Sequence, residues 1–260
     1  MTLPNPLDMF NINGRVALIT GAFGSGAARV LAEAGCRLVL AAGKTSELAA
    51  LAAECRAGGA EVVEINARPS SAAACADKVA RAVDGFGSLD ILVVASGMNK
   101  VAKIDAMEPV AFAAVIDANV TQSWLLARAA TVQMTAQGSG KIVLVSSARE
   151  LLWHPAGYSA NCASKAVVDG MTRALGCELG PLGITVNAIA PTVFRAPLTA
   201  WMFEDTDNAK AARAGFLARV PKGRLGEPED LAGPLLFLAP NASDFYTGHI
   251  LYADAGYTAG

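Results

Sequence analysis

Short apolar runs alternate with longer alanine-rich stretches along the chain from Arg15 onward. This alternation is typical of β-strands that alternate with helices around a parallel sheet. Most of the short runs are apolar throughout, as expected of strands that helices cover on both faces. The pattern predicts strands at 16–20, 37–42, 61–65, 90–95, 141–147, 184–190 and 249–254.

The stretches between these runs predict helices, and glycine-containing segments mark where two of them end. These segments are GFG at 85–87 and GSG at 138–140, and glycine is favoured there because the residue after a helix often takes a left-handed conformation. No linker or repeat divides the series, so we expect one domain over 1–260. The predicted helices are 26–34, 46–57, 71–84, 108–136, 158–179 and 227–238.

Residues 191–214 are the one irregular insertion in this series, and they carry Trp201, Met202 and Phe203. The segment lies between the last two predicted strands, at the edge of the sheet where open α/β folds bind ligands. We therefore predict a substrate lid at 191–214. The alternative is a pair of surface helices that packs on the domain.

The composition indicates a folded chain with a large core. The chain has 260 residues, of which 17% are charged, and its mean hydropathy is +0.38, which excludes disorder. No apolar run approaches the ~20 residues of a transmembrane helix, so we expect no membrane span. A net charge of -2 argues against a surface that binds nucleic acid or membranes. We therefore expect a small-molecule substrate as the partner.

Five cysteines are spread along the chain without a C-x-x-C pair or a histidine in ligand spacing, so we expect reduced thiols and no metal site. The N-terminal segment MTLPNPLDMF has no basic stretch ahead of an apolar one. It is therefore neither a secretory nor a transit peptide by its pattern. A cytoplasmic location is the expectation that follows by default.

A glycine-rich loop follows the first predicted strand. The strand at 16–20 runs directly into Gly21, Gly24 and Gly26 and then into a helix, which is the context of a dinucleotide-binding loop. Glycines there let backbone N–H groups and the helix N-terminus approach a pyrophosphate closely. The loop therefore favours a nucleotide site at this edge of the sheet.

Further segments resemble, in their order and spacing, the short-chain dehydrogenase/reductase family. They are Thr20-Gly21, Asn119 in DANV, Ser146-Ser147, CASK ending at Lys165, NAIAP at 187–191, and GRLGEPEDLAGPLLFLA followed by YTGHILYADAGY. The resemblance covers nearly the whole chain. It implies a single doubly wound Rossmann-type α/β domain with a seven-stranded parallel sheet flanked by helices. It also implies NAD(H) or NADP(H) as cofactor and a homodimer or homotetramer formed through the helices at 108–136 and 158–179.

The loop after the first strand departs from the family pattern T-G-x-x-x-G-x-G. After Gly21 the glycines come at 24 and 26, each one position early. Counting back from Gly35 makes the segment about three residues shorter than the family norm, so it offers fewer N–H donors to phosphate. Phe23 stands where a small polar residue is usual, and it either plugs the cofactor cleft or packs under the loop.

The end of the second strand bears on the choice of cofactor. An acid at this point accepts hydrogen bonds from the adenosine 2′-hydroxyl of NAD, whereas this chain has AAGK at 41–44. Lys44 favours NADP(H) over NAD(H), and the alternatives are a solvated Lys44 and no cofactor at all. VASG at 94–97 also replaces the family's N-N-A-G, and Thr192 replaces a glycine. The predicted cofactor-binding residues are Gly21, Phe23, Gly24, Gly26, Lys44, Asn66, Gly97, Pro191 and Thr192.

The catalytic segment matches the family only in part. The resemblance implies a tyrosine that exchanges a proton with the substrate and a lysine four residues later that lowers its pKa. It also implies a serine that holds the substrate oxygen and an asparagine that supports a proton-relay water. Lys165, Asn119 and Ser147, with Ser146 beside it, match three of these residues, but Asn161 stands in the tyrosine position.

Tyr158 is the nearest phenol to Lys165 and the candidate substitute for the tyrosine. It lies seven residues before Lys165, which is ~10.5 Å along a helix axis against ~6 Å for a spacing of four. Lys165 would therefore acidify it weakly, unless the first helical turn is irregular. Asn161 cannot replace a phenol as acid or base, because its amide does not titrate in the useful range.

The loop between the serine pair and this helix offers other polar groups. His154 is suited to proton transfer near neutral pH, and the alternative is a solvent-facing histidine beside Pro155. Arg149 and Glu150 lie in the same loop, which borders the substrate in this fold. The alternative for them is a mutual pair on the surface.

Three functions agree with these observations. The first is an NAD(P)(H)-dependent oxidoreductase that acts on a secondary alcohol or ketone of a small apolar or ring-containing substrate, with Tyr158 as the substitute phenol. The second is a non-redox enzyme of proton-transfer, lyase or isomerase type, in which Ser147 and Asn161 hold the substrate and His154 or Lys165 moves the proton. The third is a catalytically silent binding or assembly subunit.

Overall fold

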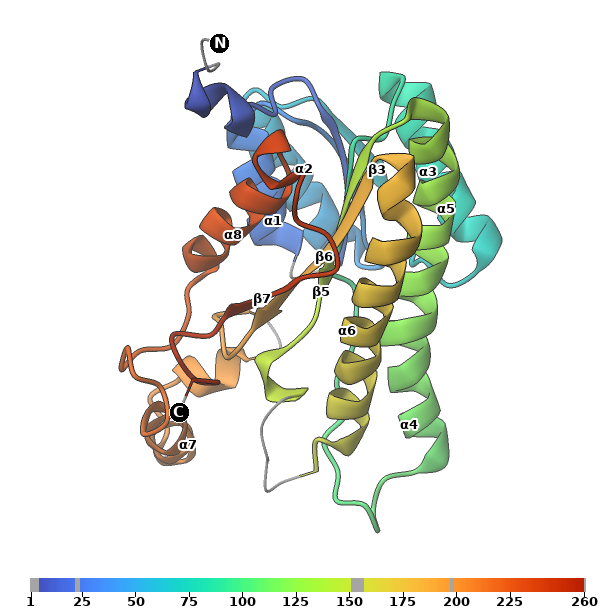
Figure 1. Ribbon diagram of the computed structural model, residues 1–260. Helices are drawn as coiled ribbons and strands as arrows, with labels where there is room; N and C mark the ends of the chain where they lie inside the picture. The colour runs from blue at the N-terminus through green and yellow to red at the C-terminus, as the bar shows by residue number, and fades with distance from the viewer. Residues whose placement is uncertain (1–4, 22–23, 151–156, 197–198, 260) are drawn as a thin grey trace.

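The computed structural model describes residues 5–21, 24–150, 157–196 and 199–259, and it confirms the predicted α/β architecture (Figure 1). Seven strands form one parallel sheet in the order β3-β2-β1-β4-β5-β6-β7. The order reverses between β1 and β4, and open α/β sheets bind ligands at the carboxyl ends of the strands at such a point. The strands are β1 Val16–Thr20, β2 Arg37–Ala41, β3 Val62–Ile65, β4 Ile91–Val94, β5 Gly140–Val145, β6 Ile184–Pro191 and β7 Ile250–Ala253.

Helices cover both faces of the sheet. Figure 1 shows α1, α2 and α8 on one face and α3, α5 and α6 on the other. In β1, Leu18 packs in the core on the side of α3, α5 and α6, whereas Ala17 and Ile19 pack in the core on the side of α1, α2 and α8. The helices are α1 Gly24–Glu33, α2 Thr45–Ala57, α3 Ala72–Phe86, α4 Pro109–Ile116, α5 Gln122–Gln137, α6 Ser159–Leu179, α7 Asp207–Leu217 and α8 Ala232–Leu238.

The ends of α3 and α5 confirm the predicted helix stops. Gly87 follows α3 with φ of 84°, and Gly138 follows α5 with φ of 75°, both in the left-handed region. At the other end of α3, the hydroxyl of Ser71 accepts a hydrogen bond of 3.1 Å from the backbone N–H of Ala74. This cap satisfies one of the N–H groups that the first helical turn leaves without a partner.

The helix predicted as continuous over 108–136 is interrupted. A π-helical segment, Asp117–Thr121, separates α4 from α5. Such segments are rare and often occur at functional sites. This one contains Asn119, whose side chain is buried and only 1% exposed.

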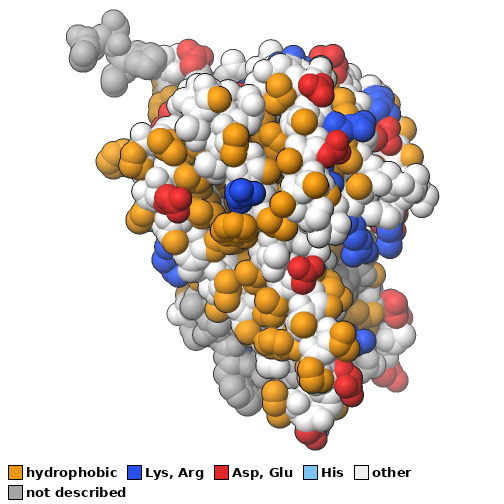
Figure 2. All heavy atoms as spheres, turned by 90° about the vertical axis from the view of Figure 1, so that its right-hand side faces the viewer, with side chains coloured by type: hydrophobic (Ala, Val, Ile, Leu, Met, Phe, Trp, Pro, Cys, Tyr) orange, Lys and Arg blue, Asp and Glu red, His pale blue; other side chains and the backbone are white. Residues whose placement is uncertain are grey.

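By length and composition, one helix in the described ranges could cross a membrane, namely Pro109–Gln137 with a mean hydropathy of 1.3. Its second half packs on the sheet through Leu126, Ala130 and Met134. Part of its outer face is apolar, and Figure 2 shows hydrophobic side chains gathered over this side of the molecule. A helix that packs on a sheet meets the same criterion, so the expectation of no membrane span stays a prediction.

The predicted lid contains a 3-10 helix, Ala200–Phe203, followed by the start of α7. Met202 and Phe216 belong to a small third core that also contains Tyr257, and the rings of Phe216 and Tyr257 stack with their centroids 5.0 Å apart. The segment thus packs against the C-terminal residues. Its role as a lid stays a prediction, and residues 197–198 lie outside the described ranges.

Candidate active site

The connection between β1 and α1 is short, as the glycine spacing predicts. β1 ends at Thr20 and α1 already begins at Gly24. Gly21 has φ of 86°, and a Cβ atom there would lie 2.4 Å from the backbone N and Cα of Ser96, so only glycine fits. The Thr20 hydroxyl donates to Ser96 Oγ at 3.1 Å. This contact fixes the end of β1 against the end of β4, whereas Phe23 lies outside the described residues.

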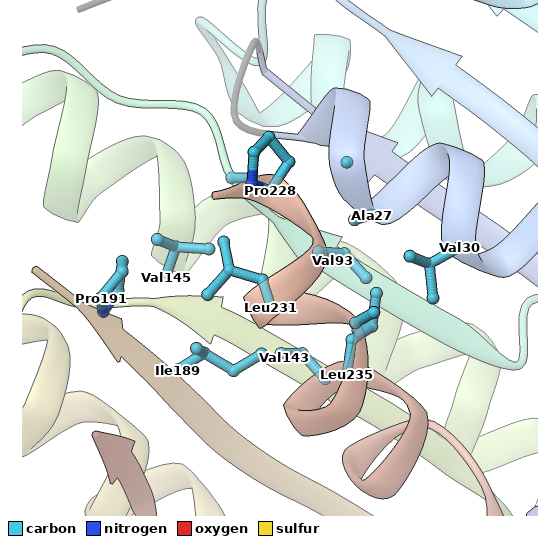
Figure 3. Close-up of a pocket in the computed structure, with 13 residues that line it drawn as sticks. Ala27, Val30, Val93, Val143, Val145, Ile189, Pro191, Pro228, Leu231 and Leu235 are labelled. Atoms are coloured by element: carbon cyan, nitrogen blue, oxygen red, sulfur yellow. The ribbon is translucent and has the colours of Figure 1, made fainter. Parts of the chain in front are cut away.

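A narrow apolar pocket lies between α1 and the 3-10 helix Pro228–Leu231, which leads into α8 (Figure 3). Two predicted cofactor residues, Gly26 and Pro191, line it together. A Cβ atom on Gly26 would lie 3.5 Å from the side chain of Pro228, so the two helices approach closely. The pocket measures about 40 Å³, whereas ligand pockets typically measure roughly 300–1,000 Å³. It therefore does not by itself hold a nicotinamide ring.

Four residues tie the π-helical segment to its surroundings, and we call Gly97, Met98, Asn119 and Ser164 the Asn119 cluster. Asn119 Oδ1 accepts from the Met98 N–H at 2.8 Å, while Asn119 Nδ2 donates to the Met98 carbonyl at 3.0 Å and to Ser164 Oγ at 2.9 Å. A Cβ atom on Gly97 would lie 2.7 Å from Asn119 Oδ1. The Asn119 side chain therefore joins the end of β4 to α6. The predicted support of a relay water by Asn119 stays a prediction.

Lys165 lies at the carboxyl end of β5. Its Nζ donates to the carbonyl oxygen of Val145, the last residue of β5, at 2.6 Å. Burial of the ammonium lowers the pKa of Lys165 to about 8, although the nearby carboxylate of Asp169 acts in the opposite direction. A lysine with a pKa of about 8 can both donate and accept a proton near neutral pH.

The serine pair follows β5 rather than ending it, because the strand stops at Val145 and not at 147 as predicted. Ser146 is buried, and its hydroxyl lies 3.5 Å from the Lys165 carbonyl oxygen. Ser147 is half-buried, and its Oγ accepts from the Arg149 N–H at 3.2 Å. This local hydrogen bond is a serine turn, and it leads into the short 3-10 helix Ala148–Glu150. Of the two serines, Ser147 is therefore the better candidate for contact with a substrate.

Asn161 occupies the first turn of α6, one turn before Lys165. It is half-buried, and its carbonyl oxygen accepts from the hydroxyl of Ser164 at 2.8 Å. Tyr158 precedes the helix as its N-cap, with φ of -98° and ψ of 12°, so it stands outside the regular helical turns. Its role as substitute phenol stays a prediction. His154 lies outside the described residues.

Asp169, which acts on Lys165, and Tyr252, which lies beside Asp169, were not predicted from the sequence. Asp169 lies one turn after Lys165 on α6 and is buried, with 3% of its surface exposed. The hydroxyl of Tyr252, on β7, lies 3.5 Å from Asp169 Oδ2, while Oδ1 has no hydrogen-bond partner among the described residues. The spacing of four between Lys165 and Asp169 is the signal that sequence reasoning could have used.

The carboxyl ends of β2 and β3 carry the predicted adenosine-binding residues. Lys44 is exposed and forms an ion pair of 2.7 Å with Glu47, and the Asn66 amide donates to the hydroxyl of Thr45. Arg68 was not predicted. Its side chain crosses Gly43, where a Cβ atom would lie 2.8 Å from Arg68 Nε. The glycine thus leaves room for the arginine side chain at the end of the sheet where the adenosine part of an NAD(P)(H) cofactor would bind.

Gly24 and Thr192 complete the predicted set. Gly24 is the first residue of α1. Thr192 follows β6 directly and is half-buried. Gly24 comes four residues after the end of β1, whereas Thr192 is the next residue after β6. Both positions are on the edge of the sheet that the carboxyl ends of the strands form, as is Lys165. The structure therefore brings the described part of the predicted cofactor set to one edge.

Comparisons with known proteins agree on the kind of protein that carries such a site. A family model described as enoyl-(acyl carrier protein) reductase matches residues 19–258. An uncharacterised oxidoreductase of Mycobacterium tuberculosis is 47% identical over 257 residues, which are 97% of this chain and 94% of the relative. A cis-4-hydroxycyclohexanecarboxylate dehydrogenase of Sinomonas cyclohexanicum is 36% identical over 250 residues, which are 94% of this chain and 97% of the relative.

A solved structure with the same fold contains a bound cofactor. It is a gluconate 5-dehydrogenase from Burkholderia cenocepacia in complex with NADP and tartrate. The two structures superpose with a TM-score of 0.90 at 30% sequence identity, over 98% of this chain and 100% of the other.

Proposed function

Because the chain belongs to the short-chain dehydrogenase/reductase family and is an oxidoreductase of that family, we propose that it interconverts a secondary alcohol and a ketone with NADP(H). The observation that carries this proposal is the hydrogen bond from Lys165 Nζ to the carbonyl oxygen of Val145. Val145 is the last residue of β5 and lies two residues before Ser147. Together Lys165 and Ser147 provide a titratable cation and a hydroxyl at the edge of the sheet where ligands bind in this fold. These two groups suffice to hold a substrate oxygen and exchange its proton.

In this mechanism Ser147 donates a hydrogen bond to the substrate oxygen. Lys165 gives a proton to that oxygen during ketone reduction and takes it back during alcohol oxidation, since its pKa of about 8 suits both directions. Asn161 cannot titrate, so it contributes only hydrogen bonds from its carboxamide. When bound, the nicotinamide supplies or accepts the hydride. Asp169 holds Lys165 closer to its charged form.

NADP(H) rather than NAD(H) is our proposal for the cofactor. Arg68 and Lys44 are two cations at the ends of β3 and β2, and Lys44 is already paired with Glu47. Arg68 would therefore make the main contact with a 2′-phosphate, with Asn66 beside the adenosine. Gly21 and the N-terminus of α1 would face the pyrophosphate.

The substrate that we propose is small and ring-containing or otherwise apolar. Trp201 and Phe203 lie in the segment proposed as a lid, and the Sinomonas relative is named for a hydroxylated cyclohexane ring. A panel of cyclic ketones tests this choice. It includes cyclohexanone, 4-methylcyclohexanone and 4-oxocyclohexanecarboxylate.

The first experiment is a titration of the protein with NADPH and with NADH, followed by fluorescence of its three tryptophans. We expect quenching with NADPH at micromolar concentration, and then consumption of NADPH in the presence of a ketone from the panel. Lack of any response at millimolar NADPH would refute the proposal, because the family chemistry requires the cofactor.

A second candidate function is favoured by the short β1–α1 connection and by Asn161. Both changes would weaken hydride chemistry, and both fit a non-redox enzyme or a silent assembly subunit. If NADPH does not bind, Ser147→Ala and His154→Ala distinguish these two. A non-redox enzyme loses turnover in at least one variant, whereas a silent subunit keeps its assembly in both.

We also propose that the chain forms a homodimer or homotetramer through α4, α5 and α6. The outer face of these helices exposes Trp124, at 46%, and Val132, at 73%. An apolar groove lies between α5 and α6, lined among others by Trp124, Val167 and Met171. Trp124→Glu should yield monomers in light scattering.

The five cysteines are all free thiols, which supports a cytoplasmic location as a further proposal.

A further inference from the structure

We propose that Arg149 binds the carboxylate of the substrate, so that the enzyme acts on an oxo or hydroxy acid. The inference that the bound acid is oxidised or reduced at its hydroxy or oxo group rests on the proposed function. The binding of the carboxylate does not depend on it.

Arg149 is held between the candidate catalytic serine and the start of α6. Its backbone N–H donates to Ser147 Oγ at 3.2 Å, and its carbonyl oxygen accepts from the thiol of Cys162 on α6 at 3.6 Å. Its guanidinium carbon lies 4.5 Å from the centroid of the Tyr158 ring. Contacts with both the loop and the helix therefore fix this cation beside the site.

The contact between the Arg149 guanidinium and the face of the Tyr158 ring leaves the N–H donors of the guanidinium available. Contact with an aromatic face uses the flat side of the group, whereas its five N–H donors point outward in the plane. Two parallel donors in that plane match the two oxygens of a carboxylate. Contact with the Tyr158 ring therefore holds the Arg149 guanidinium in place, and a substrate carboxylate would accept hydrogen bonds from its in-plane N–H donors.

No described carboxylate pairs with Arg149. The described residues contain seven ion pairs, and none of them includes this arginine. Arg149 is also half-buried, and a partly buried charge gains most from a bound counterion. Among the described side chains, which do not include that of Glu150, a ligand carboxylate would therefore be the first counterion of Arg149.

The position of the cation also limits the shape of the acid. Lys165 lies six residues after Ser159, the first residue of α6, which is roughly 9 Å along the helix axis, and Tyr158 precedes Ser159. The carboxylate would bind near Tyr158 and the reacting oxygen near Lys165 and Ser147. We therefore expect a carboxylate that is separated from the reacting carbon by a ring or a short chain, rather than one attached directly to it.

The test measures binding to the full-length protein without cofactor, by calorimetry or ligand-observed NMR. The probes are cyclohexanecarboxylate and the neutral cyclohexanecarboxamide, which share one ring. The unmodified protein should bind the acid about ten- to a hundredfold more tightly than the amide, as expected for charge-assisted hydrogen bonds. Arg149→Gln should abolish this preference and leave the affinity for the amide unchanged.

Two further variants keep the outcome interpretable. Arg149→Lys keeps the charge but loses the planar pair of donors, so it should retain a preference smaller than that of the unmodified protein. Glu150→Gln should leave the preference unchanged, and a tenfold gain would instead indicate that Glu150 occupies the guanidinium and would overturn the proposal. A preference that persists in Arg149→Gln would overturn it as well.

Failure of this inference is distinguishable from failure of the proposed function. Reduction of cyclohexanone with NADPH depends on the proposed function and not on Arg149. If Arg149→Gln reduces cyclohexanone normally but 4-oxocyclohexanecarboxylate with a tenfold or greater increase in KM, both proposals stand. Equal KM values for the acid in both proteins would remove the role of Arg149 and leave the reductase intact.

Discussion

The Asn119 cluster and the β1–α1 connection lie at the same edge of the sheet, yet they follow the family pattern to different degrees. Asn119 matches the pattern and is buried, with three hydrogen bonds from its side chain to Met98 and Ser164. The β1–α1 connection departs from the pattern, since its glycines at 24 and 26 each come one position early and α1 begins already at Gly24. The cluster joins the segment after β4 to α6, whereas our proposal for the loop beyond Gly21 is a role in cofactor binding alone.

This difference indicates which features the fold itself requires. Gly21 is required by packing, since a Cβ atom would overlap Ser96, and it stays even though the loop after it is short. The Tyr position of the family, occupied here by Asn161, has no comparable packing role. Asn119 and Gly21, which have packing roles, thus match the family, whereas Asn161 and the glycine spacing after Gly21 depart from it.

The largest effect is expected from Lys165→Met, which tests whether the site still transfers a proton although Asn161 replaces the family's tyrosine. Removal of the proton donor should lower kcat for ketone reduction about 10²- to 10⁴-fold. The measurement is NADPH consumption with the best ketone of the panel. NADPH affinity serves as the control and should change less than threefold. Unchanged kcat would exclude Lys165 as the proton donor.

The next largest effect is a loss of stability in Asn119→Ala, which disrupts the Asn119 cluster. This change removes the side-chain partner of the Met98 N–H and carbonyl groups and of the buried Ser164 hydroxyl, so the free energy of unfolding should fall by about 1–3 kcal/mol. Urea unfolding measures it. Asn66→Ala is the matched control, because Asn66 is exposed, and it should change stability by less than about 0.5 kcal/mol. Equal losses in both variants would contradict the structural role of the Asn119 cluster.

The fold followed from the sequence because hydrophobic patterning and glycines determine it locally. β1 was predicted at its observed bounds, and α6 within one residue. The π-helical segment Asp117–Thr121 was not predicted, since its residues have no distinctive pattern and its geometry depends on the contact between Asn119 and Met98. Tertiary contacts of this kind are invisible to periodicity.

The site could be predicted only as far as motifs reach. Lys165, Asn119 and Ser147 were recognised by spacing, and the structure places Lys165 and Ser147 near the end of β5. Arg68 was missed because its role depends on crossing Gly43, 25 positions earlier in the chain. Asp169 was missed for a different reason, since an acid on a helix is usually solvated and only burial distinguishes this one.

Asn161→Tyr returns the family's tyrosine to its usual position and so tests what its replacement by asparagine changes. A phenol one turn before Lys165 would share the proton transfer, so kcat for ketone reduction should rise about 10- to 100-fold. Asn161→Phe is the matched control, because it adds the ring without the hydroxyl. A similar gain in both variants would attribute the effect to packing and not to the phenol.

Arg68→Ala tests the adenosine end, where a smaller change is expected. Loss of a charge-assisted contact with the 2′-phosphate should weaken NADPH binding about tenfold, while NADH binding should stay the same. Tryptophan quenching measures both constants. Lys44→Ala is the matched control and should weaken NADPH binding less, because Lys44 is paired with Glu47. Equal weakening of NADPH and NADH would refute recognition of the phosphate.

The smallest effect is a shift of the pH profile in Asp169→Asn. Burial lowers the pKa of Lys165 to about 8 and Asp169 raises it, so loss of the carboxylate should lower that pKa further. Reduction requires the charged lysine, and kcat therefore falls as the pH rises through this pKa. The fall should occur at lower pH in the variant, whereas a purely structural role of Asp169 would lower kcat equally at every pH.

The same pKa predicts how stability depends on pH, which checks the shift without any substrate. The folded chain holds Lys165 at a pKa of about 8, below the value of about 10.4 for an unfolded lysine. Between these values the unfolded chain binds more protons, so this residue makes the free energy of unfolding rise with pH across that window. Asp169→Asn should extend the window to lower pH, because the folded-state pKa falls while the unfolded value stays. Urea unfolding of both proteins at pH 7 and 9 measures the difference, and parallel curves would show that Asp169 does not act on Lys165.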